Sequence, residues 1–274
     1  MTKILTGLKE ITIKRHGQQL EKDFVAIEEP LEIRLNGDPL VVTMRTPGHD
    51  QELSAGFLHS EGLVASGTDI LSSSATTSNP AANATQLQTT NFEGHSISIV
   101  TNDTVSSNSI KKVKREFTAT AACGVCGKQE IDDLRQELPR VNSIATSTKL
   151  LESLPHLLKE EQRLFKHTGG IHAAGIFSLE GKLLCLREDI GRHNAVDKAI
   201  GHFVLKNQVP LINKILVVSG RAGFELVQKA LKAEIPIMVS VGAASSIAVE
   251  MALRTGMTLY SFAGRDRGNL HVGS

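Results

Sequence analysis

The sequence predicts a mixed α/β fold, and two patterns carry this prediction. In the last third of the chain, the apolar runs KILVVSG, IPIMVSVG and MTLYSF alternate with two segments of helical periodicity, RAGFELVQKALKAE and AASSIAVEMALRTG. Strands that alternate with helices over short connections pair in parallel through right-handed crossovers. Near the N-terminus, apolar and polar residues alternate as they do in strands. We therefore expect a mixed sheet with a parallel βαβαβ C-terminal unit, and a smaller β-rich N-terminal subdomain.

The N-terminal strands are predicted from FVAIEEPLEIRLNGDPLVVTMRT, which alternates on both sides of a turn signal at Asn36-Gly37-Asp38-Pro39. A helix should follow, with Asp50 as its N-cap and an apolar stripe that starts at Leu53. Residues 66–91 are rich in Ser, Thr, Asn and Ala, which predicts a poorly ordered or peripheral connection. The run SISIV after it is typical of a further edge strand.

The middle of the chain predicts a long helix and then a hairpin. In TSTKLLESLPHLLKEEQRLFKHTGG, leucines recur at helical spacing, Pro155 should kink the helix, and Gly169-Gly170 should end it. The stretch IHAAGIFSLEGKLLCLRED predicts two strands that turn at Glu180-Gly181.

Composition excludes several classes of protein. The chain has 274 residues, 41% apolar residues and a net charge of +1, so no overall field attracts nucleic acid or a membrane. It has no Trp and one Tyr, which argues against a protein that stacks single-stranded bases. No apolar run has the length of a signal peptide or a membrane span, and three cysteines do not make a disulfide framework. We expect a cytoplasmic protein with reduced thiols that binds neither nucleic acid nor membrane.

Three loops at the predicted carboxyl ends of the parallel strands have the composition of anion-binding loops. They are SGRAG at 219–223, SVGAASS at 240–246 and FAGRDRGN at 262–269. The first two lead into helix N-termini, which favour phosphate, and the arginines of the first and third loops could add bidentate contacts. The alternative is that these small residues only form tight turns. Neither a P-loop nor a G-x-G-x-x-G after a strand occurs, which argues against a nucleoside triphosphatase or a standard dinucleotide fold.

The stretch EDIGRHNAVDKAIG, residues 188–201, predicts a helix with two cations in its first turn. Asp189 is expected to cap this helix, and Arg192 and His193 follow it. Cations at this end oppose the helix dipole, so either a bound anion neutralises them or solvent screens them.

Two of the three cysteines, Cys123 and Cys126, lie in AACGVCGKQE, a loop of small residues. A C-x-x-C pair can be half of a zinc site, a redox pair or a nucleophile with a neighbour, or it can be packed inertly. Zinc would need two more ligands. No second C-x-x-C exists, and the loose candidates are His167, His172 and His193.

A zinc-dependent deaminase does not fit the order of these motifs. Such enzymes carry His-x-Glu before Pro-Cys-x-x-Cys. Here His172-Ala173-Ala174 lacks the glutamate and follows the cysteines, and the residue directly before Cys123 is not a proline. Cys185 lies within the apolar strand pattern KLLCLRE and is expected to be a small core residue.

The glycines at 124 and 127 predict a loose loop, which suits a sulfur atom that is carried from one place to another. A thiolate can attack a sulfur donor, hold the outer sulfur as a persulfide and release it to an acceptor. Positive neighbours lower the pKa of a thiol, although a basic run can also be a solvated surface. Basic residues flank the loop at Lys111, Lys112, Lys114, Arg115 and Lys128.

Together these motifs resemble the FdhD family, the sulfur-carrier accessory proteins of formate dehydrogenase. The cysteine loop combined with the Gly-Arg-His helix start is highly specific. The matching pieces follow the family's order over nearly the whole chain: EEP at 28–30, CGVCG at 123–127, TGGIHAAG at 168–175, EDIGRHNAVDKAIG at 188–201, VVSGRAGFELVQKA at 217–230, AVEMA at 248–252 and FAGRDR at 262–267.

The resemblance implies a sulfurtransferase with a cysteine persulfide intermediate. The family takes sulfur from a cysteine desulfurase and passes it to the molybdenum or tungsten bis-molybdopterin guanine dinucleotide cofactor, before that cofactor enters formate dehydrogenase. Cys123 would hold the persulfide and Cys126 would assist or protect it. A GDP-like nucleotide would mimic part of the bound cofactor. The matching cofactor-binding residues are Phe262, Ala263, Gly264, Arg265, Asp266 and Arg267.

The resemblance also implies a homodimer and a core similar to that of cytidine deaminases without their zinc. We accordingly assign residues 1–120 to the β-rich subdomain with its Ser/Thr-rich connection, and residues 121–274 to the cysteine loop and an α/β cofactor-binding domain. Two alternatives stay open: a non-catalytic cofactor chaperone whose C-x-x-C binds zinc or protects the ligand, and a thiol oxidoreductase.

Overall fold

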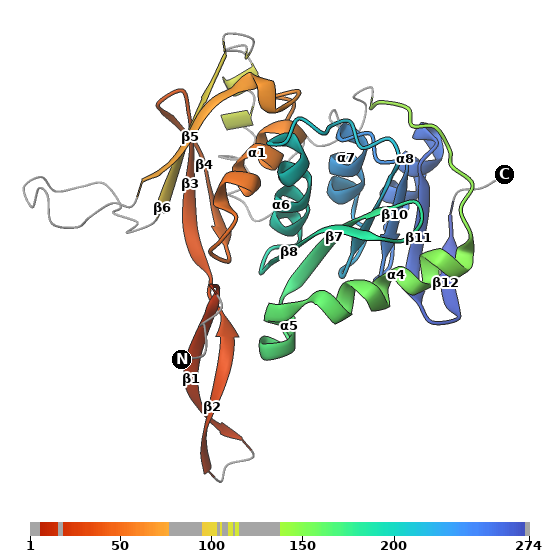
Figure 1. Cartoon of the computed structure of the whole chain (residues 1–274), viewed down its shortest axis with the longest axis horizontal. Helices are drawn as coiled ribbons and strands as arrows, with labels where there is room; N and C mark the ends of the chain where they lie inside the picture. Colours follow the sequence, from red (N-terminus) through yellow and green to blue (C-terminus); the bar gives the residue numbers. More distant parts are fainter. Residues whose placement is uncertain are drawn as a thin grey trace, which may run out of the picture.

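The described part of the chain forms three β-sheets and the helices that pack against them (Figure 1). One sheet has six strands, one has four, and the third is the hairpin of β1 (Leu8–Arg15) and β2 (Gln19–Ala26), which extends away from the rest of the molecule. The computed structural model describes residues 6–15, 19–76, 95–102, 105, 109–111, 113–114 and 138–271.

The six-stranded sheet confirms the predicted C-terminal unit. Its strand order is β12-β11-β10-β9-β7-β8; β9, β10 and β11 are parallel, whereas β7, β8 and β12 each run antiparallel to a neighbour. The predicted hairpin turn is also confirmed, with Gly181 in the left-handed region at φ 85°. The strands are β7 (His172–Ser178), β8 (Leu183–Asp189), β9 (Lys214–Val218), β10 (Ile237–Ser240), β11 (Thr258–Gly264) and β12 (Arg267–Leu270).

Helices cover both faces of this sheet, which explains why its parallel strands are continuously apolar. Along β9, Ile215 and Val217 pack on the face covered by α4 (Thr148–Glu161), while Leu216 and Val218 face the opposite cluster. That second face is covered by α6 (Arg192–Val204), α7 (Phe224–Lys232) and α8 (Ser246–Thr255).

The predicted long helix is two helices, α4 (Thr148–Glu161) and α5 (Arg163–Thr168), and the kink predicted at Pro155 within α4 stays a prediction. The helix continues through Pro155, which is buried on the face that packs against the sheet. The interruption lies at Gln162, whose ψ of 96° is not helical. Gly169 ends α5 in the left-handed region, as expected.

The four-stranded sheet has the order β4-β3-β6-β5, and two expectations about it were wrong. The SISIV run is β6 (His95–Thr101), an interior strand parallel to β3 (Glu29–Leu35), and its two isoleucines are buried beside Ile33 and Leu35 of β3. Part of the Ser/Thr-rich connection forms the edge strand β5 (Ile70–Thr76); its remainder, from residue 77 to 91, lies outside the described residues.

The turn predicted before β4 (Asp38–Arg45) is present, with Asn36 and Gly37 both at positive φ. Helix α1 (Asp50–Ser60) follows, but Asp50 is not its N-cap. The cap position is His49, and the carboxylate of Asp50 instead accepts two hydrogen bonds of 3.0 Å from the buried guanidinium of Arg45.

Two glycines allow α1 and α6 to pack with their backbones in contact, side by side in Figure 1. A Cβ atom on Gly56 would lie 1.9 Å from the carbonyl oxygen of Asp197, and one on Gly201 would lie 1.8 Å from that of Glu52. The crossing joins the N-terminal strands and α1 to the α/β unit, and one hydrophobic cluster runs across both. The predicted boundary between residues 120 and 121 lies outside the described residues, so the division into domains stays a prediction.

We expect Gly201→Ala to lower the free energy of unfolding by about 3 kcal/mol, because the new methyl group meets the backbone of α1, which cannot move aside alone. Urea denaturation followed by circular dichroism measures this loss. Gly170→Ala is the matched control: its Cβ would meet nothing closer than 3.8 Å, so the loss should stay below about 0.5 kcal/mol. Equal losses in the two variants would contradict this account of the crossing.

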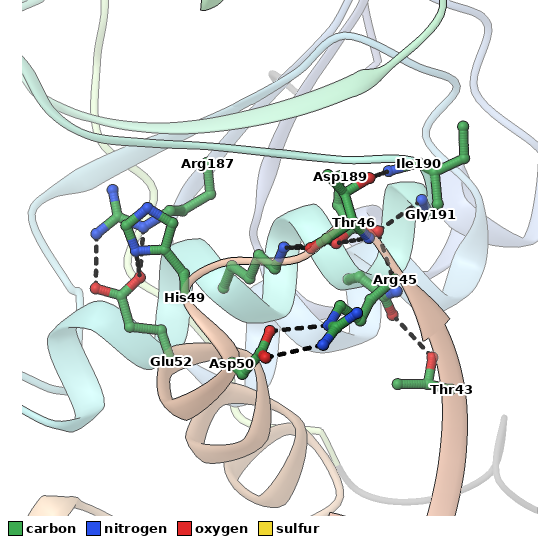
Figure 2. A network of polar contacts seen from close by, with 12 residues as sticks. Thr43, Arg45, Thr46, His49, Asp50, Glu52, Arg187, Asp189, Ile190 and Gly191 are labelled. Carbon is green, nitrogen blue, oxygen red and sulfur yellow. Dashed lines mark hydrogen bonds and ion pairs between the residues drawn. The ribbon is translucent and has the colours of Figure 1, made fainter. Parts of the chain in front are cut away.

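A buried polar network fixes the same junction (Figure 2). The carboxylate of Asp189, at the end of β8, forms an ion pair of 2.6 Å with the Lys198 ammonium. It also accepts hydrogen bonds from the backbone N–H groups of Thr46 and Gly191, at 3.1 and 2.8 Å. Lys198 also donates to the carbonyl of Thr46 at 2.8 Å. The predicted helix cap is therefore wrong: the N-cap of α6 is Gly191, because Asp189 is fully engaged with a lysine of α6 and with the backbone after β4.

A second pair lies beside this network in Figure 2. The guanidinium of Arg187 holds the carboxylate of Glu52 through two hydrogen bonds, and the rings of His49 and His202 complete the surroundings of that carboxylate. Burial alone would raise the pKa of Glu52, but the hydrogen bonds from Arg187, His49 and His202 outweigh it and hold the pKa well below its ordinary value.

Candidate ligand-binding site at the carboxyl ends of the parallel strands

The structure brings the three predicted loops together at the carboxyl ends of β9, β10 and β11. The backbone N–H of Gly242 donates to the carbonyl of Gly220 at 2.9 Å, and that of Phe262 donates to the carbonyl of Gly242 at 3.0 Å. Ala222 and Ala244 form a parallel bridge between the first two loops. The loops are thus one continuous surface, as expected for a ligand site at this edge of a parallel sheet.

A cavity of about 1200 Å³ opens on the α4 side of this edge. This is larger than the range of roughly 300–1,000 Å³ that is usual for small-molecule sites. One part of its wall comes from the strand ends, at Ser219, Val241 and Gly264. Another comes from the facing sides of α4 and α5, and the Gly169-Gly170 turn and His172 connect the two.

The predicted cofactor-binding segment contributes half of its members to this wall. Gly264, Arg265 and Arg267 line the cavity. Ala263 is buried in the hydrophobic cluster beneath α4, so it supports the segment from below. Phe262 and Asp266 are not among the lining residues.

The geometry of the turn between β11 and β12 places the two arginines. A bulge lies between Ser261 and Gly264, with Phe262 at φ 53°, and Asp266 at φ 55° forms the turn itself. A Cβ atom on Gly264 would lie 3.0 Å from Nε of Arg267. A glycine at this position therefore lets the side chain of Arg267 lie close over the backbone of its partner strand.

Cations outnumber carboxylates on the cavity wall, which favours an anionic ligand. Lys159 and Lys166 join the two arginines, whereas the carboxylates are Glu152 and Glu160. Glu152 accepts a hydrogen bond of 3.0 Å from the hydroxyl of Tyr260. The wall therefore combines charge for an anion with an apolar surface for the rest of a ligand.

His172 is the histidine at the start of β7 and lies against Gly220 of the first loop. Burial lowers the pKa of His172, and the positive charges of Arg192 and His193 lower it further. Its ring is therefore neutral near pH 7, and it adds a hydrogen-bonding group to the cavity rather than another charge.

The first two residues of α6, Arg192 and His193, are basic, although the positive end of the helix dipole lies at the same place. His193 forms an ion pair with Glu225 in the first turn of α7, and the resulting hydrogen bond lowers the pKa of Glu225. Arg192 is exposed. No anion is needed to explain His193, so the solvent-screening alternative accounts for Arg192 and an ion pair for His193.

Comparison with known proteins decides the family. The model of the FdhD/NarQ family matches residues 26–274. The chain belongs to the FdhD/NarQ family. The resemblance stated from the sequence motifs is thereby confirmed.

Curated members of the FdhD/NarQ family match over nearly their whole length. The sulfur carrier protein FdhD of Mycobacterium tuberculosis is 43% identical over 251 residues, which cover 90% of this chain and 89% of that protein. The protein of the same name from Sulfurisphaera tokodaii is 40% identical and covers 96% and 93% of the two chains. A crystal structure from Desulfotalea psychrophila, described as a formate dehydrogenase accessory protein, has a TM-score of 0.71 at 24% identity and covers 97% of this chain and 96% of its own, which shows the same fold.

Both cysteines of the family motif, Cys123 and Cys126, lie outside the described residues. The third, Cys185, is buried on β8, so the prediction of a small core residue is confirmed, and burial raises the pKa of its thiol to about 11. Within the residues that the structure describes, no group of three His, Cys, Asp or Glu side chains could hold a metal ion, and no helix is long and apolar enough to cross a membrane.

The α4–α5 wall is the part of the candidate site that the sequence motifs did not reveal. Its residues, including Gln162 and Phe165, were assigned only to a predicted amphipathic helix. The one available signal was the break in helical periodicity after Glu161, where a polar residue falls on the buried side.

Proposed function

We propose that this chain is a sulfur carrier that acts in the maturation of formate dehydrogenase. The observation that carries the proposal is its similarity, over nine-tenths of its length, to relatives named sulfur carrier protein FdhD. The cavity at the strand ends supports it, because a carrier must hold its acceptor while the sulfur is transferred.

The sulfur-bearing group in this proposal is Cys123. Its thiolate attacks the outer sulfur of a persulfide on a cysteine desulfurase; a new S–S bond forms, and the desulfurase cysteine leaves as a thiolate. In the second step the thiolate of Cys126 attacks the Sγ atom of Cys123. As the Cys123–Cys126 disulfide forms, the bond between Sγ of Cys123 and the outer sulfur breaks. The outer sulfur takes up a proton and leaves as hydrosulfide for the acceptor, and a cellular thiol reductant restores both thiols.

The acceptor in this proposal is the molybdenum or tungsten bis-molybdopterin guanine dinucleotide, bound as a substrate. Its diphosphate groups match Arg265 and Arg267, which present guanidinium groups from the turn between β11 and β12. Its ring systems match the apolar part of the wall, and the cavity is large enough for more than one ring.

The remaining parts of the proposal concern assembly and relatedness. We propose that the protein is cytoplasmic, that it acts as a homodimer, and that a cysteine desulfurase and formate dehydrogenase are its partners. We also propose that the core is related to cytidine deaminases without their zinc. The order β8-β7-β9-β10-β11, in which β7 runs antiparallel to both of its neighbours and β9, β10 and β11 are parallel, supports that relationship.

We expect Arg265→Ala and Arg267→Ala each to weaken GDP binding by about tenfold, because each removes a charge-assisted contact to the diphosphate. Isothermal titration calorimetry with GDP measures the dissociation constant. Arg254→Ala is the matched control, since this exposed arginine lies in the last turn of α8 and not on the cavity wall. If both variants bound GDP as tightly as the unchanged protein, the cavity would not be the nucleotide site.

A further inference from the structure

The wall formed by α4 and α5 contains a buried carboxamide that lacks a partner. Gln162 lines the cavity and is 4% exposed. Its Nε2 atom has no hydrogen-bond partner in the part of the chain that the structure describes. Buried amide groups are nearly always paired, because an unpaired donor has lost its water without replacement. Gln162 as a residue lines the cavity, so rotation of its carboxamide about the last side-chain bond would turn this donor toward a ligand held there.

The surroundings of Gln162 indicate the shape of that ligand. Phe165 follows Gln162 by three positions in the next helix, and both side chains line the cavity. The ammonium of Lys159 lies 6.0 Å from the centre of the Phe165 ring. An aromatic ring beside a buried amide suits a flat heterocycle, which can pack against the ring and present its polar edge to the amide.

We propose that Gln162 recognises the lactam edge, the adjacent C=O and N–H groups, of a guanine or pterin ring held in the cavity. Its carboxamide carries one acceptor and one pair of donors side by side, which complements a lactam. The terminal amide rotates about its last bond, so it can present either atom to the ring. This inference rests on the proposed function only for the class of ligand. In this proposal, the wall at Gln162 binds the ring of the ligand, and the turn at Arg265 and Arg267 binds its phosphates.

The test compares three probes, GDP, free pterin and inorganic pyrophosphate, on the full chain and on Gln162→Leu. We expect Gln162→Leu to weaken the binding of GDP, of pterin or of both by about tenfold, while pyrophosphate binding stays unchanged. Loss for GDP alone assigns the wall to guanine, and loss for pterin alone assigns it to the pterin. The melting temperature should stay equal or rise, because the variant removes an unpaired buried donor.

Two controls keep the result specific. Gln162→Met retains the length of the side chain without its amide and should repeat the effect of Gln162→Leu. Gln208→Leu changes an exposed glutamine away from the cavity wall and should bind all three probes as the unchanged protein does.

The inference is overturned if both Gln162 variants bind GDP and pterin with unchanged affinity, or if they lose pyrophosphate binding to the same extent as ring binding. It is also overturned if the unchanged protein binds neither ring. Sulfur uptake by the unchanged protein is measured separately, so a chain that accepts sulfur but binds neither ring would refute this inference and leave the sulfur-carrier proposal standing.

Discussion

Replacing Cys123 with alanine is expected to abolish formate dehydrogenase maturation while the protein stays folded. The substitution removes the only atom that can hold the transferred sulfur in the proposed mechanism, so no partial route remains. The measurement is formate dehydrogenase activity in a bacterial host that lacks its own member of the family and is supplied with the variant. A fall of at least about a hundredfold is expected, as for removal of a nucleophile that forms a covalent intermediate.

The matched control for this experiment is Cys185→Ala. Cys185 is buried and its pKa is raised to about 11, so it cannot supply a thiolate near pH 7. This variant should support maturation at close to the unchanged level. Maturation that survives Cys123→Ala, with circular dichroism showing a folded protein, would favour the cofactor chaperone over the sulfur carrier.

The largest loss of stability is expected from breaking the buried ion pair between Asp189 and Lys198. Their side chains are 0% and 1% exposed, and Lys198→Met leaves the carboxylate of Asp189 buried without its cation. Loss of one member of such a pair costs about 3–5 kcal/mol, which is a large share of the 5–15 kcal/mol that a folded domain typically has. Urea denaturation measures the loss.

Two further variants test whether the unpaired buried charge causes the loss of stability in Lys198→Met. The double variant Asp189→Asn with Lys198→Met removes both charges and should recover part of the loss, because no unpaired charge is left buried. Lys22→Ala breaks the exposed pair with Glu10 at 2.6 Å and should change stability by less than about 1 kcal/mol. A Lys198→Met protein that unfolds at the same urea concentration as the unchanged chain would show that the network of Figure 2 contributes little.

The sequence predicted the α/β unit well because its signals are local. Strands such as β9 and β10 are buried on both faces and are apolar throughout, and their helices follow within a few residues. Once the strands are parallel, their carboxyl ends must lie at one edge, so the loops at 219–223, 240–246 and 262–269 could be grouped before the structure was known.

The wrong predictions about helix caps and strand positions concern interaction partners that local sequence patterns do not reveal. Asp50 and Asp189 have the residue type of helix caps, but Arg45 and Lys198 bind their carboxylates more strongly than a backbone N–H would. The interior position of β6 depends on its pairing with β3, more than sixty residues away, which no local pattern encodes.

The candidate site was predicted in part. Its charged turn at Arg265 and Arg267 was identified from the sequence because it ends a parallel strand. Its other wall was missed, since a helix that packs on a core and a helix that lines a cavity share the same periodicity. The unpaired amide of Gln162 becomes visible only when burial and hydrogen bonding are known.

The measurement that most directly tests the central claim is the intact mass of the protein after incubation with a cysteine desulfurase and free cysteine. The account predicts one added sulfur atom on the unchanged chain, removable by a thiol reductant, and none on Cys123→Ala. An unchanged mass for the wild-type chain, or an added sulfur that persists in Cys123→Ala, would contradict it.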